Sequence, residues 1–338
     1  MLRKYLTLIV LIALALPAAV ASADAANDVF CGELSQSDCQ ILLDNAAVMD
    51  SLNSFAVFVS LALEADSDEP THVFAQAYGQ FEIDDESLQT INQLAADTQE
   101  DDWGALAEIF LTSVKADVRI QMRDLSSGEE VESEVKLLLK DGILMLSADA
   151  LSALSGEDLT GMEGFGIDLN DAIGELLAES GAMPEADAAE MQEIEALADS
   201  ATSITRLPDG EVSGVAVAVF NTDFDLGAFF SLVSPEQLLA ASNDLGDSRT
   251  LSEIMDSIEV GEFSVTHRIG LEDSYTYGMD ILVDMSMSHT KDGQLRTSTI
   301  NFEMAALLSN FGEPVNVAIP EDVFAFPLAM LLQMRESG

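Results

Sequence analysis

Alternating hydrophobic and polar residues are the most regular feature of the chain between positions 54 and 147. Side chains of a β-strand point to opposite faces in turn, so alternation with a period of two predicts strands that bury one face. Strands are expected at about 54–65, 71–83, 114–123, 130–140 and 143–147. Asp141 and Gly142 predict a two-residue hairpin between the last two of them.

The strands at 114–123 and 130–140 carry charges that predict their register. Pairing residues whose numbers add to 253 sets Arg119 opposite Glu134 and Asp117 opposite Lys136. Sliding one strand by two residues sets Arg119 opposite Lys136 instead. Like charges directly opposite each other are unfavourable, so the first register is expected.

A second group of alternating segments follows between 202 and 319. A turn at 208–210 is expected to lead into a strand that carries Val212, Val215, Val217 and Val219. Three further strands, at about 262–271, 275–289 and 294–304, form a meander. Asp292 and Gly293 predict the last turn, in a register that pairs Met285 with Ile300, Val283 with Phe302 and Ile281 with Met304.

Helices are expected between and around these strands. Ser35 and Asp38 resemble a capping box at the start of a helix that precedes the first strand. Other helical segments are predicted at about 85–96, 102–111, 168–178, 185–198, 221–230, 235–241 and 321–334. About ten strands in antiparallel runs with helices grouped between them predict an α+β fold, with a sheet wide enough to curl.

The start of the chain predicts a secretory signal peptide over residues 1–23. Arg3 and Lys4 precede an apolar run at 5–16, and small residues after it offer cleavage sites ending at Ala21 or Ala23. A membrane anchor is the alternative, but the run is shorter than the roughly 20 residues that span a bilayer. No cysteine follows the cleavage sites directly, so an extracytoplasmic protein without a lipid anchor is expected.

The chain is strongly acidic, with 13 Lys and Arg against 61 Asp and Glu and a net charge of −48. Loss of the two basic residues of the signal would leave 11 against 61, a net charge of −50. Nucleic-acid binding is excluded because phosphate contacts need clustered Lys and Arg, and only transient contact with a membrane is expected. Hydrophobic residues make up 48% of the chain, too many for a disordered acidic segment.

The only two cysteines, Cys31 and Cys39, enclose a short loop near the expected mature N-terminus. In an oxidising compartment they are expected to form a disulfide. Their spacing does not fit a C-x-x-C redox pair, and no further cysteine or nearby histidine completes a zinc site. The pair therefore predicts a structural staple within an N-terminal segment at 24–53.

The sequence offers no catalytic motif, and no cofactor is expected. His72, His267 and His289 lack the spacing of a metal-binding pair, and neither a nucleophile elbow nor a P-loop is present. Acidic pairs such as Asp223 and Asp225, or the run at 100–102, are interpreted as solvated surface rather than calcium ligands. A carboxylate-dependent hydrolase stays open as an alternative because acidic pairs are so abundant.

The positive signal is an apolar face rich in aromatic residues and methionine. Flexible methionines and flat aromatic rings suit an adaptable apolar cavity, although an ordinary core gives the same pattern. The candidate ligand-binding residues are Tyr275, Tyr277, Met279, Ile281, Val283, Met285, Phe324, Phe326 and Met330.

Residues 309–320 read SNFGEPVNVAIP, after a strand, a short helix and three meander strands that begin near 211. This order resembles the end of the LolA/LppX-type envelope lipid carriers, and the helix before strand 54–65 is similar to their beginning. The resemblance implies a curved antiparallel half-barrel closed by helices, with an apolar cavity for acyl chains. It implies a half-barrel domain over 54–334, interrupted by an acidic helical insertion at about 149–200.

The function expected from these features is non-enzymatic binding of a lipid or other apolar ligand under the sheet. The alternative is a secreted structural or interaction module with a filled core and no ligand.

Overall fold

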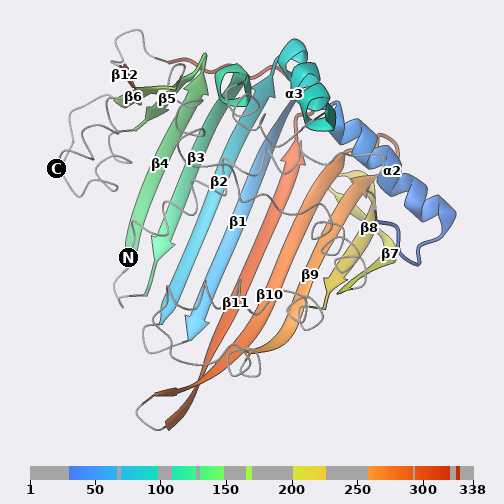
Figure 1. Ribbon diagram of the computed structural model, residues 1–338, viewed down its shortest axis with the longest axis vertical. Coiled ribbons are helices and arrows are strands. Elements are labelled where there is room, and N and C mark those ends of the chain that lie inside the picture. The colour runs from blue at the N-terminus through green and yellow to red at the C-terminus, as the bar shows by residue number, and fades with distance from the viewer. Residues whose placement is uncertain are drawn as a thin grey trace.

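A computed structural model describes residues 30–66, 70–97, 109–126, 130–147, 165–169, 201–225, 258–291, 294–319 and 325–327. Two long helices and twelve strands lie within them (Figure 1). They are α2 (Gln36–Asp50), β1 (Ser54–Asp66), β2 (Thr71–Ile83), α3 (Asp85–Asp97), β3 (Val114–Asp124), β4 (Val131–Lys140), β5 (Ile143–Leu146), β6 (Phe165–Asp168), β7 (Thr202–Val212), β8 (Val215–Phe224), β9 (Ile258–Gly270), β10 (Thr276–Lys291), β11 (Gln294–Ser309) and β12 (Ala325–Pro327).

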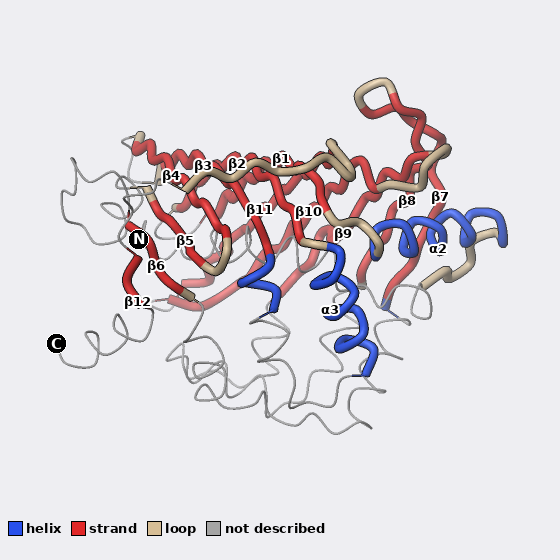
Figure 2. Tube along the Cα trace, turned by 90° about the horizontal axis from the view of Figure 1, so that it is seen from above, coloured by secondary structure: helices blue, strands red, loops and turns tan. Residues whose placement is uncertain are grey.

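All twelve strands join one sheet in the order β12-β6-β5-β4-β3-β2-β1-β11-β10-β9-β8-β7. Every pairing is antiparallel except the short β12–β6 pair. The sheet is curved, and α2 and α3 lie on its concave side (Figure 2). The predicted α+β fold with a curved antiparallel half-barrel sheet is therefore confirmed.

The concave face carries the main hydrophobic core. In β3, the buried positions are Val114, Ala116, Val118, Ile120 and Met122, which alternate with more exposed polar residues. Met49 of α2 and Leu88 of α3 belong to the same cluster. Burial of one such aliphatic side chain contributes about 1.5–3 kcal/mol. Because all five lie on the same side of β3, this gain favours burial of that face and leaves the other face to solvent.

The predicted register between β10 and β11 is confirmed: Met285 pairs with Ile300 and Ile281 pairs with Met304. The hairpin between β4 and β5 is also confirmed, with Lys140 opposite Ile143. Its two turn residues, Asp141 and Gly142, both have positive φ, of 52° and 74°. That conformation matches the right-handed twist of adjoining strands, which explains why Asp-Gly is favoured there.

The predicted register between β3 and β4 is wrong by two residues. Arg119 lies opposite Lys136, and Ile120 lies opposite Val135. The observed register sets the fully buried side chains of Ile120 and Val135 against each other, whereas the predicted register would have set the smaller Ser133 opposite Ile120. Arg119 is largely exposed, so its repulsion from Lys136 is screened by solvent. Packing of the buried face decides the register.

Several segments that were predicted to be turns or helices form strands in the structure. Residues 208–210 belong to β7, which has a register shift at that point, and the turn lies at Ser213 and Gly214 instead. The helix expected at 221–230 is wrong over its first four residues, which extend β8. The helix expected at 321–334 is wrong at Ala325–Pro327, which form β12. Short apolar runs do not distinguish a helix from a strand by their periodicity alone.

Most of the expected insertion at 149–200 lies outside the described residues. Within it, Phe165–Asp168 form β6, where no strand was expected. The expected helix at 185–198 and the signal peptide at 1–23 also lie outside the described residues, as does all but residues 109–111 of the helix expected at 102–111.

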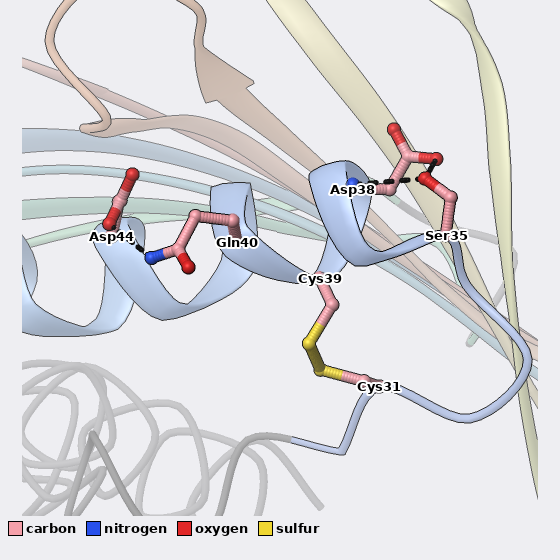
Figure 3. The surroundings of a disulfide bond; sticks show 6 residues. All are labelled: Cys31, Ser35, Asp38, Cys39, Gln40 and Asp44. Atoms are coloured by element: carbon pink, nitrogen blue, oxygen red, sulfur yellow. Dashed lines mark hydrogen bonds between the residues drawn. A yellow bond between two sulfur atoms is a disulfide. The ribbon is translucent and has the colours of Figure 1, made fainter.

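A disulfide joins Cys31 to Cys39 across a Cα–Cα distance of 5.3 Å, as expected (Figure 3). It ties the segment before α2 to the first turn of that helix. The predicted cap is confirmed because Ser35 Oγ accepts a hydrogen bond from the Asp38 backbone N–H at 3.2 Å. The predicted staple and helix start therefore form one local unit.

Polar contacts attach α2 to the strands beneath it. Asn45 donates hydrogen bonds to the Ser274 carbonyl at 2.7 Å and to Thr276 at 3.0 Å. The Arg206 guanidinium lies over the Phe220 ring, 5.1 Å from its centroid, and its Nε lies 3.5 Å from Asp38. In the described part of the chain, no helix has the length and apolar character needed to span a membrane.

Candidate functional site

A groove of about 980 Å³ crosses the sheet at right angles to its strands. Six neighbouring strands line it, and each contributes three consecutive residues. The strands are β4, β3, β2, β1, β11 and β10. At the usual inter-strand spacing of about 4.8 Å, five gaps give a length of about 24 Å.

The middle residue of each triplet belongs to a single transverse row of the sheet. The pairings Ser133–Met122, Met122–Ala75, Ala75–Leu61, Leu61–Met304 and Met304–Ile281 connect them directly. Met122, Ala75 and Met304 are buried members of the concave core. Since residues of one row share a face, the side chains of these six residues point to the concave core. The two outer residues of each triplet point to the opposite face and line the groove on the convex side.

The helices and the groove lie toward opposite ends of β2. The helices pack near the end of β2 that carries Ile83, through Met49 and Leu88. The groove crosses β2 at Ala75, toward the opposite end of that strand.

The transverse row is apolar apart from one hydroxyl group. Ser133 Oγ is buried and has no hydrogen-bond partner within the described part of the chain. The outer residues of the triplets, which face the groove, include four carboxylates, those of Glu132, Glu134, Asp280 and Glu303. The described lining of the groove is therefore partly acidic.

Arg123 is the basic residue among the described lining residues, and its guanidinium is engaged elsewhere. It lies 3.4 Å from Glu130 Oε1 and 5.5 Å from the centroid of the Phe74 ring. Asp280 is paired with Arg268, and this hydrogen bond raises the pKa of Arg268 above its usual value. The described lining therefore carries four carboxylates against one guanidinium, and its net charge is negative.

Of the ligand-binding residues predicted from sequence, Ile281 lines the groove. Met279 precedes it by two positions on β10 and packs against the concave core, while Val283 and Met285 follow it with partly exposed side chains. Phe326 lies in β12, where it pairs with Ile167. Phe324 and Met330 lie outside the described residues.

Tyr275 and Tyr277 form an aromatic cluster with Phe311, apart from the groove lining. The Tyr275 and Phe311 rings stack at 4.4 Å, and Tyr277 meets Phe311 edge-on at 5.2 Å. Tyr277 donates a hydrogen bond to Asp273 at 2.6 Å. Burial, this hydrogen bond and the nearby carboxylate raise the pKa of Tyr277 to about 12. The cluster closes the end of β10 next to the segment that follows β11.

The row residues Leu61, Ala75, Met122, Ser133 and Met304 were not among the predicted ligand-binding residues. The confirmed β10–β11 register already set Ile281 opposite Met304, so the sequence held part of the row. The remaining residues come from strands far apart along the chain. Their alignment depends on the β1–β11 pairing and on the β3–β4 register, which sequence reasoning did not supply.

Ionisable groups outside the groove have structural partners. Burial alone would raise the pKa of Glu82, but hydrogen bonds from Lys115 and the Val315 N–H lower it. Both hydrogen bonds measure 2.5 Å and fix the segment after β11 to β2 and β3. The described residues contain no group of three or more His, Cys, Asp or Glu side chains placed to hold a metal ion.

His267 lies in register between Phe220 on β8 and Met279 on β10. Burial lowers the pKa of His267 below its ordinary value. The side chain is therefore neutral at physiological pH.

The convex face carries three exposed hydrophobic side chains on neighbouring strands. Phe58 is paired with Tyr78 and with Leu307, and they are 39%, 42% and 42% exposed. Single exposed apolar residues are normal on protein surfaces. This convex trio provides a comparison surface for the apolar row on the concave side.

No protein-family model and no curated protein matches the chain. Among solved structures, it is similar to the lipoprotein LppX of Mycobacterium tuberculosis, at 9% identity and a TM-score of 0.30, covering 82% of this chain and 97% of that one. A domain described as an outer membrane lipoprotein-sorting protein from Vibrio parahaemolyticus gives 8% identity and a TM-score of 0.18, covering 82% and 93%. A DUF1329 family protein from Desulfovibrio piger gives 6% and 0.18, covering 82% and 92%. At these TM-scores the likeness carries no argument about fold or function.

Proposed function

We propose that this protein is a non-enzymatic binding protein for a lipid or another apolar molecule, held under the concave face of the sheet. The observation that carries the proposal is the apolar row from Met122 to Ile281, whose side chains point to that face. Small-molecule sites usually have predominantly apolar linings with a few polar groups.

The length of the transverse row favours a chain-like ligand. A bilayer core of about 30 Å allots about 15 Å to each leaflet, so a row of about 24 Å accommodates one membrane acyl chain. Each buried methylene contributes about 0.8 kcal/mol, so a dozen of them offset the cost of ordering a flexible chain.

We also propose that the chain is exported and works outside the cytoplasm, without a lipid anchor. The Cys31–Cys39 disulfide supports an oxidising compartment. The acidic surface would limit contact with anionic membranes to brief encounters. The proposed half-barrel domain at 54–334 would include the acidic insertion at 149–200 as a lid or rim of the proposed ligand site.

A module with a filled core and no ligand is the second candidate. It is favoured by the tight packing under the helices, where Val118, Ile120 and Val135 have almost no exposed area. The two candidates differ in what occupies the row from Ser133 to Ile281.

Native mass spectrometry separates the two candidates. The protein would be unfolded to strip bound lipid, refolded with its disulfide intact, and mixed with a total lipid extract. Binding of one chain-like lipid per protein is expected. Absence of any bound lipid, together with no uptake of an apolar fluorescent dye, would favour the filled-core module.

A further inference from the structure

The convex face carries balanced charges around the groove, although the molecule as a whole is strongly acidic. Four carboxylates project there from the rows that line the groove: those of Glu132, Glu134, Asp280 and Glu303. Four cations of the described strands project from the same rows or from the next row along, at Arg119, Arg123, Lys136 and Arg268. These residues form a convex patch whose formal charges cancel, within a chain that carries −48.

The convex trio lies on the middle strands of this patch. Phe58 pairs directly with Tyr78 on one side and with Leu307 on the other, so their exposed side chains form one continuous ridge. Across the groove from this ridge, Phe74 pairs with the much smaller Ala62. A contiguous apolar surface with a charged rim is typical of protein–protein interfaces.

The distribution of charge favours a second copy of this chain as the partner. On β3 and β4 the patch has three cations against two carboxylates, whereas on β9, β10 and β11 it has two carboxylates against one cation. A strongly basic partner would meet the cations of the first half, and a strongly acidic partner would meet the carboxylates of the second. Two copies related by a two-fold axis would instead set each half against the opposite half.

A two-fold axis that runs parallel to the strands, between β1 and β2, makes the patch complementary to itself. It sets β1 over β2 of the second copy, and β3 over β11. Phe58 then meets the partner's Tyr78, and Phe74 meets the partner's Ala62. Each aromatic ring therefore faces either another ring or a small side chain that leaves room for it.

The same axis brings Arg123 to the partner's Glu303. Arg123 lies 3.4 Å from Glu130 in its own chain, but both side chains are half exposed, and such pairs contribute little. Glu303 is exposed and forms no ion pair within the described residues. Both groups are therefore available, and symmetry forms the contact twice.

We propose that the convex patch joins two copies of the chain in a symmetric dimer. The patch measures about 24 Å across the strands and about 13 Å along them, at the small end of protein interfaces, so the dimer is weak. Net repulsion between two acidic molecules also opposes it at low salt. Both concave faces point outward and stay free, so the dimer does not depend on the proposed ligand site.

Charge reversal tests the contact by sedimentation velocity on the purified full chain, over a range of protein concentrations. The dimer is expected to strengthen between 0.1 M and 1 M salt, because screening weakens the net repulsion. Arg123→Glu and Glu303→Arg should each weaken dimerisation at least about 10-fold at equal salt, since like charges then meet twice. An equimolar mixture of the two variants should form a mixed dimer, in which both contacts again join opposite charges.

Glu211→Arg on β7 is the matched control. It changes the net charge by the same amount as Glu303→Arg, but it lies outside the patch and should not weaken the dimer. Thermal melts of each variant show whether it is folded. Should Arg123→Glu lower the melting temperature, Glu303→Arg still tests the contact, because that side chain is exposed.

The outcomes are separable. A natural protein that stays monomeric at every concentration and salt would overturn the dimer. If that monomer binds a lysine-rich peptide and Glu303→Arg abolishes the binding, the patch serves a basic partner, and the dimer is overturned as well. A dimer that both variants leave unchanged would place the contact elsewhere, as would a mixture of folded variants that does not restore association. None of these results depends on lipid binding, which native mass spectrometry measures separately.

Discussion

Two alanines on the concave face have similar burial but different surroundings. Ala75, 6% exposed, lies in the transverse row, while Ala116, 3% exposed, lies in the packed core between Phe81 and Leu139. A larger side chain has space above Ala75 if the proposed ligand site lies over the row. Above Ala116 it must displace neighbours.

We predict opposite results for Ala75→Phe and Ala116→Phe. Overpacking a filled core costs about 1–3 kcal/mol, so Ala116→Phe should lower the free energy of unfolding by that amount, measured by urea denaturation. Ala75→Phe should change it by less than about 1 kcal/mol and abolish binding of an apolar dye. A loss of several kcal/mol in Ala75→Phe would mean that the row is already filled.

His267 gives a pH prediction at the same scale. Because burial lowers its pKa in the folded protein, the unfolded chain takes up a proton first as pH falls. Stability should therefore be complete above the ordinary histidine value of about 6.5 and decline below it. Thermal melts between pH 7.5 and 5.5 would measure this decline, which His267→Gln should reduce and the control His72→Gln should not. An equal decline in all three proteins would rule His267 out as its source.

At the scale of elements, the strands that pair locally were predictable and those that pair across the chain were not. The β10–β11 and β4–β5 hairpins follow from Asp-Gly turns and from apolar residues meeting in register. The β3–β4 register was wrong because charge was weighed above the position of Ser133 on the buried face. The pairing of β1 with β11 joins the two halves of the sheet and continues the transverse row from one half to the other. No turn or other local feature of the sequence predicts this pairing. Ile281 was therefore found, and Leu61 and Met122 were not.

A cysteine pair can verify the β3–β4 register. Gln121 lies opposite Glu134, so the double variant Gln121→Cys with Glu134→Cys should form a disulfide on oxidation, detected by peptide mass mapping. Arg119→Cys with Glu134→Cys should not, although the charge-based register would have paired those two. Cross-linking of the second pair alone would reverse the assignment.

The N-terminal staple predicts a loss of stability. A loop closed by residues eight apart contributes about 2–3 kcal/mol in the chain-entropy description, so Cys39→Ser should lower the free energy of unfolding by about that much. The natural protein in a reducing buffer should unfold like the variant. Equal stability in oxidising and reducing buffer would show that the staple does not contribute.

The molecule as a whole carries far more negative than positive charge, at −48. Mutual repulsion of surface carboxylates opposes the compact state, and salt shortens the range of this repulsion from about 10 Å at 0.1 M to about 3 Å at 1 M. The melting temperature should therefore rise by several degrees between these salt concentrations, measured by differential scanning fluorimetry. A fall in melting temperature would indicate that attractive ion pairs such as Lys115–Glu82 outweigh the repulsion.

The sheet has two large faces, and the central claim is that an apolar chain binds one of them. A long-chain alcohol with a photoreactive diazirine in its tail tests this most directly, through mass mapping of the labelled peptides. Labels are expected on the transverse row, at Leu61, Ala75, Met122 and Met304, and an excess of unlabelled alcohol should compete them away. Labelling confined to the convex trio of Phe58, Tyr78 and Leu307, or labelling without competition, would contradict a binding site on the concave face.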